Sequence, residues 1–462
     1  MGSSTAEESS VPPEPVPPKS GPPESVPPEP GPPATPAPAE APESIPLRRH
    51  RPLLLLVTEQ MTSSVGRQVT ALALPLLAIA HLHAGPLGAS ALMAMTYLPG
   101  VLLSPLIGVA VDRARLRRML VSVSWLQVPA IGSVPLAAAL DGLTWPHLFV
   151  AAAASGALNS AQGVALQSCL PRVVPPERLL PANSSLTGAR TIGLIGGPAL
   201  GGILIGLIDP APALLVECAA YLVGGALFLA LPAALNRSAR EAGSGARSRL
   251  EALREGLAVI RRETLLRRQA LAAAGLNLGG GAGGGLFVLY ADRELRLSPW
   301  QLGTVYAAYA VGMGTGVLVA TSVTRALGMA RAIRLCAVGA GAALFLIPAA
   351  SLGLSFAVLV LYQLLFGLTA TIWSIAMTTG RQLVTPAHLL GRVNAFLQAV
   401  LTATLPVGAF VGGWLASRVG IVPVLVGAAA VALAGASSLW FPRDVLAEIE
   451  RAAERKTVPQ KP

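Results

Sequence analysis

Charged residues are scarce in this chain of 462 residues: Asp, Glu, Lys and Arg make up 12% of it, while hydrophobic residues make up 53%. A soluble domain carries about 25% charged residues, so this balance excludes that class and fits a helical membrane protein. The chain has 3 cysteines, Cys169, Cys218 and Cys336, and all lie in or beside apolar segments. No disulfide framework is therefore expected.

Motifs of common enzymes are also missing. The sequence has no Gly-x-x-x-x-Gly-Lys-Ser/Thr phosphate loop, no His-Glu-x-x-His zinc pair and no Gly-x-Ser-x-Gly nucleophile elbow. These absences argue against ATP-driven pumping and hydrolysis. His81 and His83 form an isolated His-x-His pair, which is more typical of a membrane surface than of a metal site. We expect no enzyme, no cofactor and no metal.

Apolar segments follow one another from about Pro52 to Phe441. A helix rises 1.5 Å per residue, so about 20 apolar residues cross a hydrocarbon core ~30 Å thick. About twelve segments meet this criterion. They lie near residues 53–80, 88–111, 119–140, 147–170, 184–208, 212–234, 270–290, 300–322, 333–350, 355–378, 393–416 and 421–441. The sequence predicts an all-α membrane protein with twelve transmembrane helices.

Arginines mark the connections on one side of these spans, for example Arg113, Arg117 and Arg118 after the second span and Arg325 after the eighth. The positive-inside rule places these connections and both termini in the cytoplasm, in a cell (inner) membrane. The net charge of +11 is explained by this topology, so no nucleic-acid partner is expected.

A longer connection divides the spans six and six. The predicted domains are a disordered Pro/Glu-rich cytoplasmic tail (1–46), an N-terminal bundle (47–235), an amphipathic cytoplasmic linker (236–269), a C-terminal bundle (270–441) and a cytoplasmic tail (442–462). Pro175, Asn183 and the pair Gly201 and Gly202 recur at the same spacing as Pro386, Asn394 and the pair Gly412 and Gly413. This pattern predicts two pseudo-symmetric bundles with a cavity between them.

A basic motif after the second span contains Gly108, Asp112, Arg113, Arg117 and Arg118. It resembles the Gly-x-x-x-Asp-Arg-x-Gly-Arg-Arg signature of the major facilitator superfamily, although Arg115 stands where that family more often has Gly or Asp. The resemblance covers the chain from about Pro52 to Phe441. It implies a secondary active transporter that works by alternating access, with the motif as a cytoplasmic gate.

A second motif lies in the fifth span and consists of Gly193, Gly197, Pro198, Gly201 and Gly202. It resembles the Gly-x-x-x-Gly-Pro-x-x-Gly-Gly motif of exporter branches, and the nearest resemblance is to bacterial macrolide and siderophore efflux proteins. The resemblance implies a hinge, with a packing motif as the alternative. It also implies export of a lipophilic or drug-like molecule by a monomer in exchange for protons.

Four charged residues lie inside predicted spans, and each costs at least ~2.5 to 3.5 kcal/mol to insert. They are Glu59, Arg67, Arg190 and Glu217. Their depths along the helices match Glu59 with Arg190 and Arg67 with Glu217. The two pairs either hold the first bundle together or couple a proton to transport through Glu59. The Arg that proton-coupled drug antiporters usually carry in helix 4 is replaced by Asn159.

Milder polar residues in the spans are candidates for the substrate cavity. They are Asn159, Gln162, Asn277, Gln363, Trp373, Asn394 and Gln398. A glycine run between Gly279 and Gly285 suggests a bending gate in the seventh span. So few charges favour lipophilic or weakly basic substrates. The alternatives are import or symport of a small metabolite, and a membrane receptor or scaffold that transports nothing.

Overall fold

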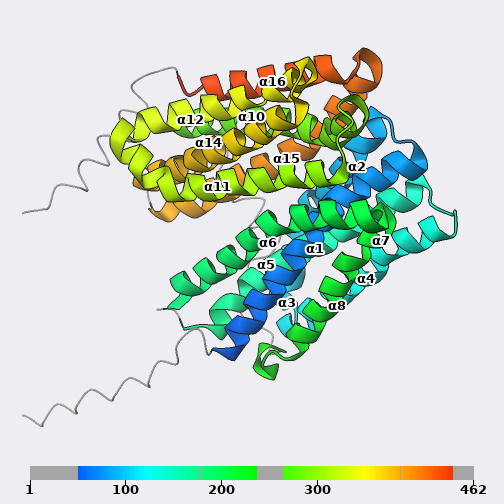
Figure 1. Ribbon diagram of the computed structural model, residues 1–462. Coiled ribbons are helices and arrows are strands. Elements are labelled where there is room, and N and C mark those ends of the chain that lie inside the picture. The colour runs from blue at the N-terminus through cyan, green and yellow to red at the C-terminus, as the bar shows by residue number, and fades with distance from the viewer. Residues whose placement is uncertain (1–49, 176–177, 237–263, 385–386, 441–462) are drawn as a thin grey trace, which may run out of the picture. The chain divides into compact units, whose positions relative to one another are not determined.

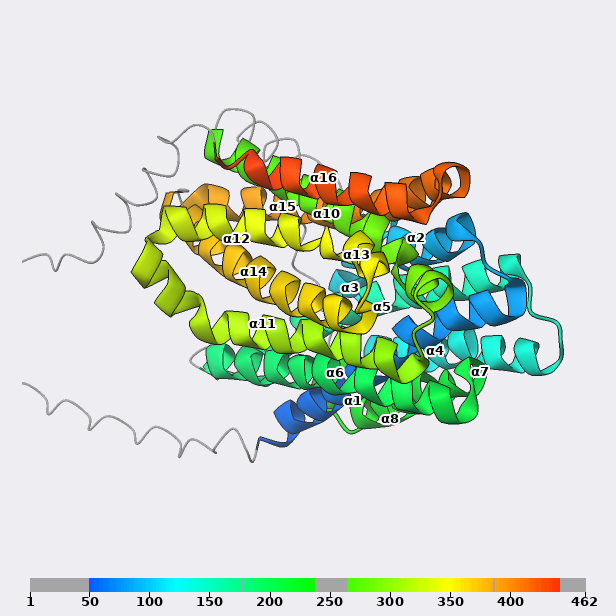
Figure 2. The ribbon, with the colours of Figure 1, turned by 45° about the horizontal axis from the view of Figure 1, so that its top comes forward.

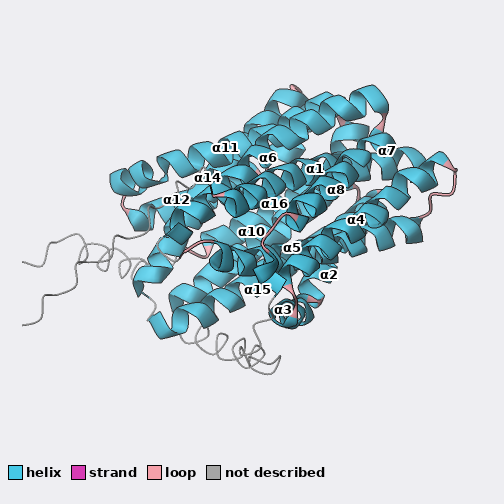
Figure 3. Ribbon diagram, turned by 90° about the horizontal axis from the view of Figure 1, so that it is seen from below, coloured by secondary structure: helices cyan, strands magenta, loops and turns pink. Residues whose placement is uncertain are grey.

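The computed structural model describes residues 50–175, 178–236, 264–384 and 387–440, which fold into helices and contain no strand (Figures 1 and 3). The all-α membrane fold with two six-helix bundles, predicted from the sequence, is confirmed. The predicted tail of residues 1–46, most of the linker of residues 236–269 and the tail of residues 442–462 lie outside the described part.

Each half of the chain contributes one bundle. The first contains α1 (Arg51–Leu82), α2 (Pro86–Leu102), α3 (Ser104–Arg113), α4 (Leu116–Ala139), α5 (Trp145–Val173), α6 (Leu179–Ile208), α7 (Pro210–Ala213) and α8 (Leu215–Leu229). The second contains α10 (Thr264–Leu289), α11 (Pro299–Leu327), α12 (Met329–Ala343), α13 (Leu346–Ala349), α14 (Ser355–Val384), α15 (Ala387–Val419) and α16 (Ile421–Ser437). Short helical turns follow at Ala233–Asn236, Tyr290–Glu294 and Ala350–Leu352.

The helix boundaries differ from the predicted spans in a few places. Ten segments of the described part are long and apolar enough to cross a membrane, while α2 and α16 are shorter. The second predicted span is divided at Leu103, because α3 begins with a proline in its first turn, which cannot continue the backbone ladder of α2. Helix α10 is described from Thr264, inside the predicted linker, and its Leu266 clusters with Val393 and Leu397 of α15.

Two seams join the bundles, and they are equivalent by the internal repeat (Figures 1 and 2). In the first, α6 packs on α11, where Gly202 lies against Pro299 and Gly303. In the second, α15 packs on α2, where Gly413 lies against Ser90. The repeated glycines therefore occupy matching positions, as expected for pseudo-two-fold symmetry.

The neighbouring repeated glycines face inward rather than across the seams. A Cβ atom on Gly201 would lie 3.1 Å from the Cα of Val69 on α1, and one on Gly412 would lie 2.8 Å from the Cα of Ala282 on α10. Since α1 and α10 are the first helices of their bundles, these two contacts also correspond. Each Gly-Gly pair thus serves one contact inside its bundle and one between the bundles.

The buried core joins the bundles at one end only. We call the end where α1 begins and α3 ends the basic end, because Arg51, Arg113 and Arg118 lie there. Buried residues of the first bundle near the basic end, such as Leu53 and Leu116, form a cluster with no described residue of the second bundle. At the opposite end one cluster includes residues from both bundles. The bundles are packed together there.

The glycine run of α10 does not interrupt the helix, which is continuous from Thr264 to Leu289. Its glycines lie against other helices instead: Gly279 meets Ala428 of α16, Gly281 meets Leu405 of α15, and Gly285 meets Ser90 of α2. The absence of a Cβ atom lets three helices approach α10 closely. In this conformation the run serves packing, and the bending gate remains a prediction.

Candidate functional site

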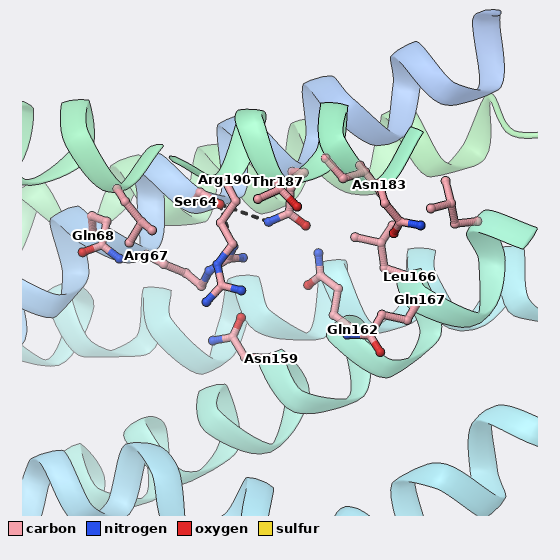
Figure 4. Close-up of a pocket in the computed structure, with 15 residues that line it drawn as sticks. Ser64, Arg67, Gln68, Asn159, Gln162, Leu166, Gln167, Asn183, Thr187 and Arg190 are labelled. Atoms are coloured by element: carbon pink, nitrogen blue, oxygen red, sulfur yellow. Dashed lines mark hydrogen bonds between the residues drawn. The ribbon is translucent and has the colours of Figure 1, made fainter. Parts of the chain in front are cut away.

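A cavity of about 370 Å³ lies in the first bundle between α1, α5 and α6 (Figure 4). Its lining combines polar side chains with an apolar wall from several leucines. The polar side chains are Gln60, Ser64, Arg67, Gln68, Asn159, Gln162, Gln167, Asn183, Thr187 and Arg190. The sequence suggested an apolar cavity with few charges, and the cavity contains two arginines. Its volume suits a small organic molecule.

Helix α1 supplies one wall of the cavity through residues that share a helical face. Gln60, Ser64, Arg67 and Gln68 are three or four positions apart or adjacent, so they line one side of the helix. The Ser64 hydroxyl accepts hydrogen bonds from Gln60 Nε2 at 3.1 Å and from an Arg67 guanidinium nitrogen at 3.0 Å. These two bonds hold the Arg67 side chain at the wall.

Glycines of the α6 motif bring the wall formed by α6 close to α1. Gly193 lies against Ser64, and a Cβ atom on Gly197 would lie 2.6 Å from the Cβ of Gln68. Arg190 lies one helical turn before Gly193, so this close approach also places Arg190 at the cavity. Figure 4 shows Arg67 and Arg190 directed toward the part of the cavity where Asn159 lies.

Behind the cavity wall lies Glu59, which is 1% exposed. Its Oε1 accepts a hydrogen bond of 2.6 Å from Gln162 Nε2, and Gln162 Oε1 in turn accepts one of 2.8 Å from Gln127 Nε2. Glu59 Oε2 has no hydrogen-bond partner among the described residues. Because Gln162 lines the cavity, it connects the buried carboxylate to the cavity.

The second buried carboxylate is Glu217 of α8, also 1% exposed. Thr70 and Tyr221 lie beside it, and Tyr221 donates a hydrogen bond of 2.8 Å to Asn159 Oδ1. Asn159 lines the cavity, so Glu217 is linked to the cavity through two side chains. Glu59 and Glu217 are therefore both buried behind residues that line the cavity. Both lie within electrostatic range of Arg67.

The structure changes the pairing of charges that depth along the helices predicted. No ion pair joins Glu59 to Arg190, or Glu217 to Arg67, within the described residues. Arg67 lies near enough to both carboxyl groups to act on each electrostatically. Arg190 lies within electrostatic range of Tyr97 of α2 and Tyr309 of α11. Depth along the helices does not include rotation about the helix axis, so equal depth alone does not bring two side chains into contact.

The structure places only two of the seven predicted cavity residues at the cavity, Asn159 and Gln162. In the second bundle Gln363 is buried, Gln398 is exposed and bonds to Thr402, and the indole nitrogen of Trp373 has no partner among the described residues. Asn277 is half-buried on α10, and the Asn394 side chain lies outside the described part. The sequence reasoning missed Gln60, Ser64, Gln68 and Thr187, although the first three repeat along one face of α1.

The basic motif ties two helix ends together near the basic end. An Arg117 guanidinium nitrogen donates to the carbonyl oxygen of Leu229, and the Arg118 backbone N–H donates to Asn236 Oδ1 at 3.3 Å. Gly108 is buried and Arg113 is exposed on α3. The side chain of Asp112 lies outside the described ones, so its predicted gating contact remains a prediction.

Two helical bundles with equivalent seams, packed together at one end, with a polar cavity in the first bundle, are the arrangement of polytopic membrane transporters. Comparison with protein families agrees. The family model of the major facilitator superfamily matches residues 59–402, and the chain belongs to this superfamily. Its members are transporters, which supports the expectation that the protein is not an enzyme.

Several known proteins are similar to this chain along most of its length. The multidrug efflux pump Tap of Mycolicibacterium fortuitum is 26% identical over 424 residues, which cover 87% of this chain and 98% of Tap. An uncharacterized transporter of the same superfamily, y4rN of Sinorhizobium fredii, is 28% identical over 395 residues, covering 84% of this chain and 94% of that protein.

Solved structures share the fold at lower identity. A bacterial homologue of the iron transporter ferroportin in its inward-facing state superposes with a TM-score of 0.67 at 21% identity, covering 86% of this chain and 99% of that one. The nucleoside transporter NupG superposes with a TM-score of 0.66 at 12% identity, covering 84% of this chain and 98% of that one. At these identities the likeness concerns the fold alone.

Proposed function

We propose that this protein is a secondary active exporter that moves a small organic molecule out of the cell by alternating access. The observation that carries the proposal is closure at one end: the two seams hold the bundles together opposite the basic end, and a polar cavity lies in the first bundle. A transporter that is closed on one side of the membrane and open on the other has this arrangement. The similarity to the efflux pump Tap and the glycine motif of α6 support export as the direction.

The charge distribution supports an orientation in the membrane. Cytoplasmic connections carry an excess of Arg and Lys, so the basic end is assigned to the cytoplasm of a cell (inner) membrane, with both termini on that side. The bundles then meet at the outer surface, and the cavity faces inward. The monomer contains both bundles and the cavity, so we assign transport to a single chain.

The α6 motif supplies the surface on which the bundles move. Helix α6 is continuous from Leu179 to Ile208 and contains Pro198, so the motif does not break the helix. Its glycines make two kinds of contact. Those within the first bundle are with α1 and involve Gly193, Gly197 and Gly201, whereas Gly202 packs against α11 of the second bundle. We assign the contact of Gly202 with Gly303 to the outer closure, which must open for release.

We assign proton coupling to Glu59. It is buried, one of its oxygens lacks a partner among the described residues, and Gln162 links it to the cavity. Protonation removes a negative charge near Arg67 and changes the bond to Gln162, and both residues line the cavity. Proton binding and substrate binding therefore influence one another.

The direction can be tested in a susceptible bacterial host that lacks its own pumps. We expect the protein to lower the cellular accumulation of at least one compound in a panel of fluorescent acids, bases and neutral molecules. The control is the Gly202→Val variant, which should insert in the membrane normally and restore accumulation. Raised accumulation with the wild-type protein would support import or symport instead, and binding without any change in accumulation would support a receptor.

A further inference from the structure

The cavity has an unusual charge balance. Arg67 and Arg190 both line it, and no carboxylate does. Glu59 and Glu217 are 1% exposed and stand behind the lining, where Arg67 compensates them. Two like charges facing one space of about 370 Å³ repel each other, and an anion bound between them relieves that repulsion.

Arg190 is the more available of the two arginines. It has no ion-pair partner within the described residues, whereas Arg67 is shared with two carboxylates and bonded to Ser64. A guanidinium group offers five N–H donors in a planar fork that matches carboxylate, sulfonate or phosphate oxygens. Thr187, one turn before Arg190, adds a hydroxyl to the same wall.

A cluster of aromatic residues lies near Arg190. Tyr97 of α2 and Tyr309 of α11, a helix of the other bundle that packs on α6, lie within electrostatic range of Arg190. Tyr309 stacks on Phe366 with ring centroids 6.1 Å apart, and Phe366 packs on Tyr362 at 5.8 Å. Beyond Tyr362 the cluster continues with Phe287 and then Tyr306, whose ring lies 5.5 Å from that of Phe287. Phe287 and Tyr362 of this cluster are buried, and Tyr309 is the member that lies within electrostatic range of Arg190 on the first bundle.

We propose that the transported molecule is an organic anion, with an acidic group held by Arg190 and Arg67 and a flat apolar body against Tyr309. This inference deepens the proposed function and rests on it. A basic compound would meet two arginines before it met a carboxylate. An uncharged compound would leave their repulsion in place. An anionic substrate would also account for an intramembrane arginine, Arg190, that has no carboxylate partner among the described residues.

The test uses matched pairs of probes that differ in charge but hardly in shape: benzoate with benzamide, and 2-naphthoate with 2-naphthamide. Binding to the purified full-length protein in detergent is measured by isothermal titration calorimetry. We expect each acid to bind more tightly than its amide. The Arg190→Gln variant should weaken acid binding by about 10- to 100-fold, the range expected for charged hydrogen bonds, and leave amide binding unchanged.

Two further variants control the result. Arg190→Lys keeps the positive charge and should retain part of the preference for the acids. Arg325→Gln removes an exposed arginine at the end of α11, outside the cavity, and should change nothing. Thermal unfolding of each variant checks that the fold is intact. The proposal is overturned if the wild-type protein binds no acid more tightly than its amide, or if Arg190→Gln weakens both members of a pair equally.

Binding in detergent does not depend on transport, so the two proposals can fail separately. If the acids bind through Arg190 but no compound is moved in cells or vesicles, the exporter proposal fails and the anion site stands. If the protein lowers the accumulation of neutral or basic compounds while the acids show no preference, the anion site fails and the exporter proposal stands.

Discussion

Replacing Gly202 with Ala should change which side of the membrane the cavity faces. A Cβ atom at position 202 would lie 2.6 Å from the carbonyl oxygen of Pro299 and 3.0 Å from the Cα of Gly303. Both are backbone atoms of α11, so neither can rotate away. Such overpacking costs about 1 to 3 kcal/mol, and it is imposed only while the seam is closed. The population with the seam open should therefore rise by roughly 5- to 150-fold relative to the closed one.

The matched control is Gly206→Ala on the same helix, where an added Cβ atom would meet nothing within 4 Å. The reporter is Thr187→Cys in the cavity, in a background with Cys169, Cys218 and Cys336 replaced by Ala. Inverted vesicles expose the basic end to a maleimide that cannot cross membranes. We expect slower labelling in Gly202→Ala than in Gly206→Ala, because the cavity then faces the other side. Equal labelling rates in the two variants would refute the role of this seam.

Three further predictions concern the charges and the glycines. Arg67→Gln should destabilise the protein by about 3 to 5 kcal/mol because two buried carboxylates lose their shared cation, whereas Arg190→Gln should unfold at nearly the wild-type temperature. Similar losses in both variants would contradict the assignment of Arg67 to the carboxylates. Glu59→Gln should keep the fold and abolish the response of vesicle transport to an imposed pH gradient, and an unchanged response would remove Glu59 from proton coupling. The Cβ atom added by Gly280→Ala on α10 would meet nothing within 4 Å. This variant should keep its transport activity, and its helix should be more stable by ~1 kcal/mol. Loss of transport would support the bending-gate hypothesis.

The sequence predicted the architecture well, because long apolar segments in a bilayer have few alternatives to helices. The recurrence of Gly201 and Gly202 as Gly412 and Gly413 predicted two related bundles, and the matching contacts of these glycines show why the spacing is repeated. The boundaries were less predictable. Helix α10 includes Thr264, inside the predicted linker, and its Leu266 contacts α15, a helix distant in the sequence that hydropathy does not reveal.

The candidate site could be predicted only in part. The charged residues were identified because charge inside a span is costly, and Asn159 and Gln162 were identified as polar groups in an apolar segment. Their partners depend on how each helix is rotated about its axis and on which helices are neighbours. Hydropathy contains neither, and within the described residues no ion pair joins Glu59 to Arg190. The second bundle was expected to contribute polar residues near the cavity, and the residue it places within electrostatic range of Arg190 is Tyr309.

Transport by inverted membrane vesicles is the most direct test of the exporter proposal. Vesicles containing the wild-type protein, energised with an acidic interior, should accumulate a radiolabelled substrate identified in the cellular assay. Accumulation should collapse when the pH gradient is dissipated and should be absent with Gly202→Val, while Gly206→Ala serves as the active control. Accumulation only in right-side-out vesicles, or the same uptake with and without the protein, would contradict export by this chain.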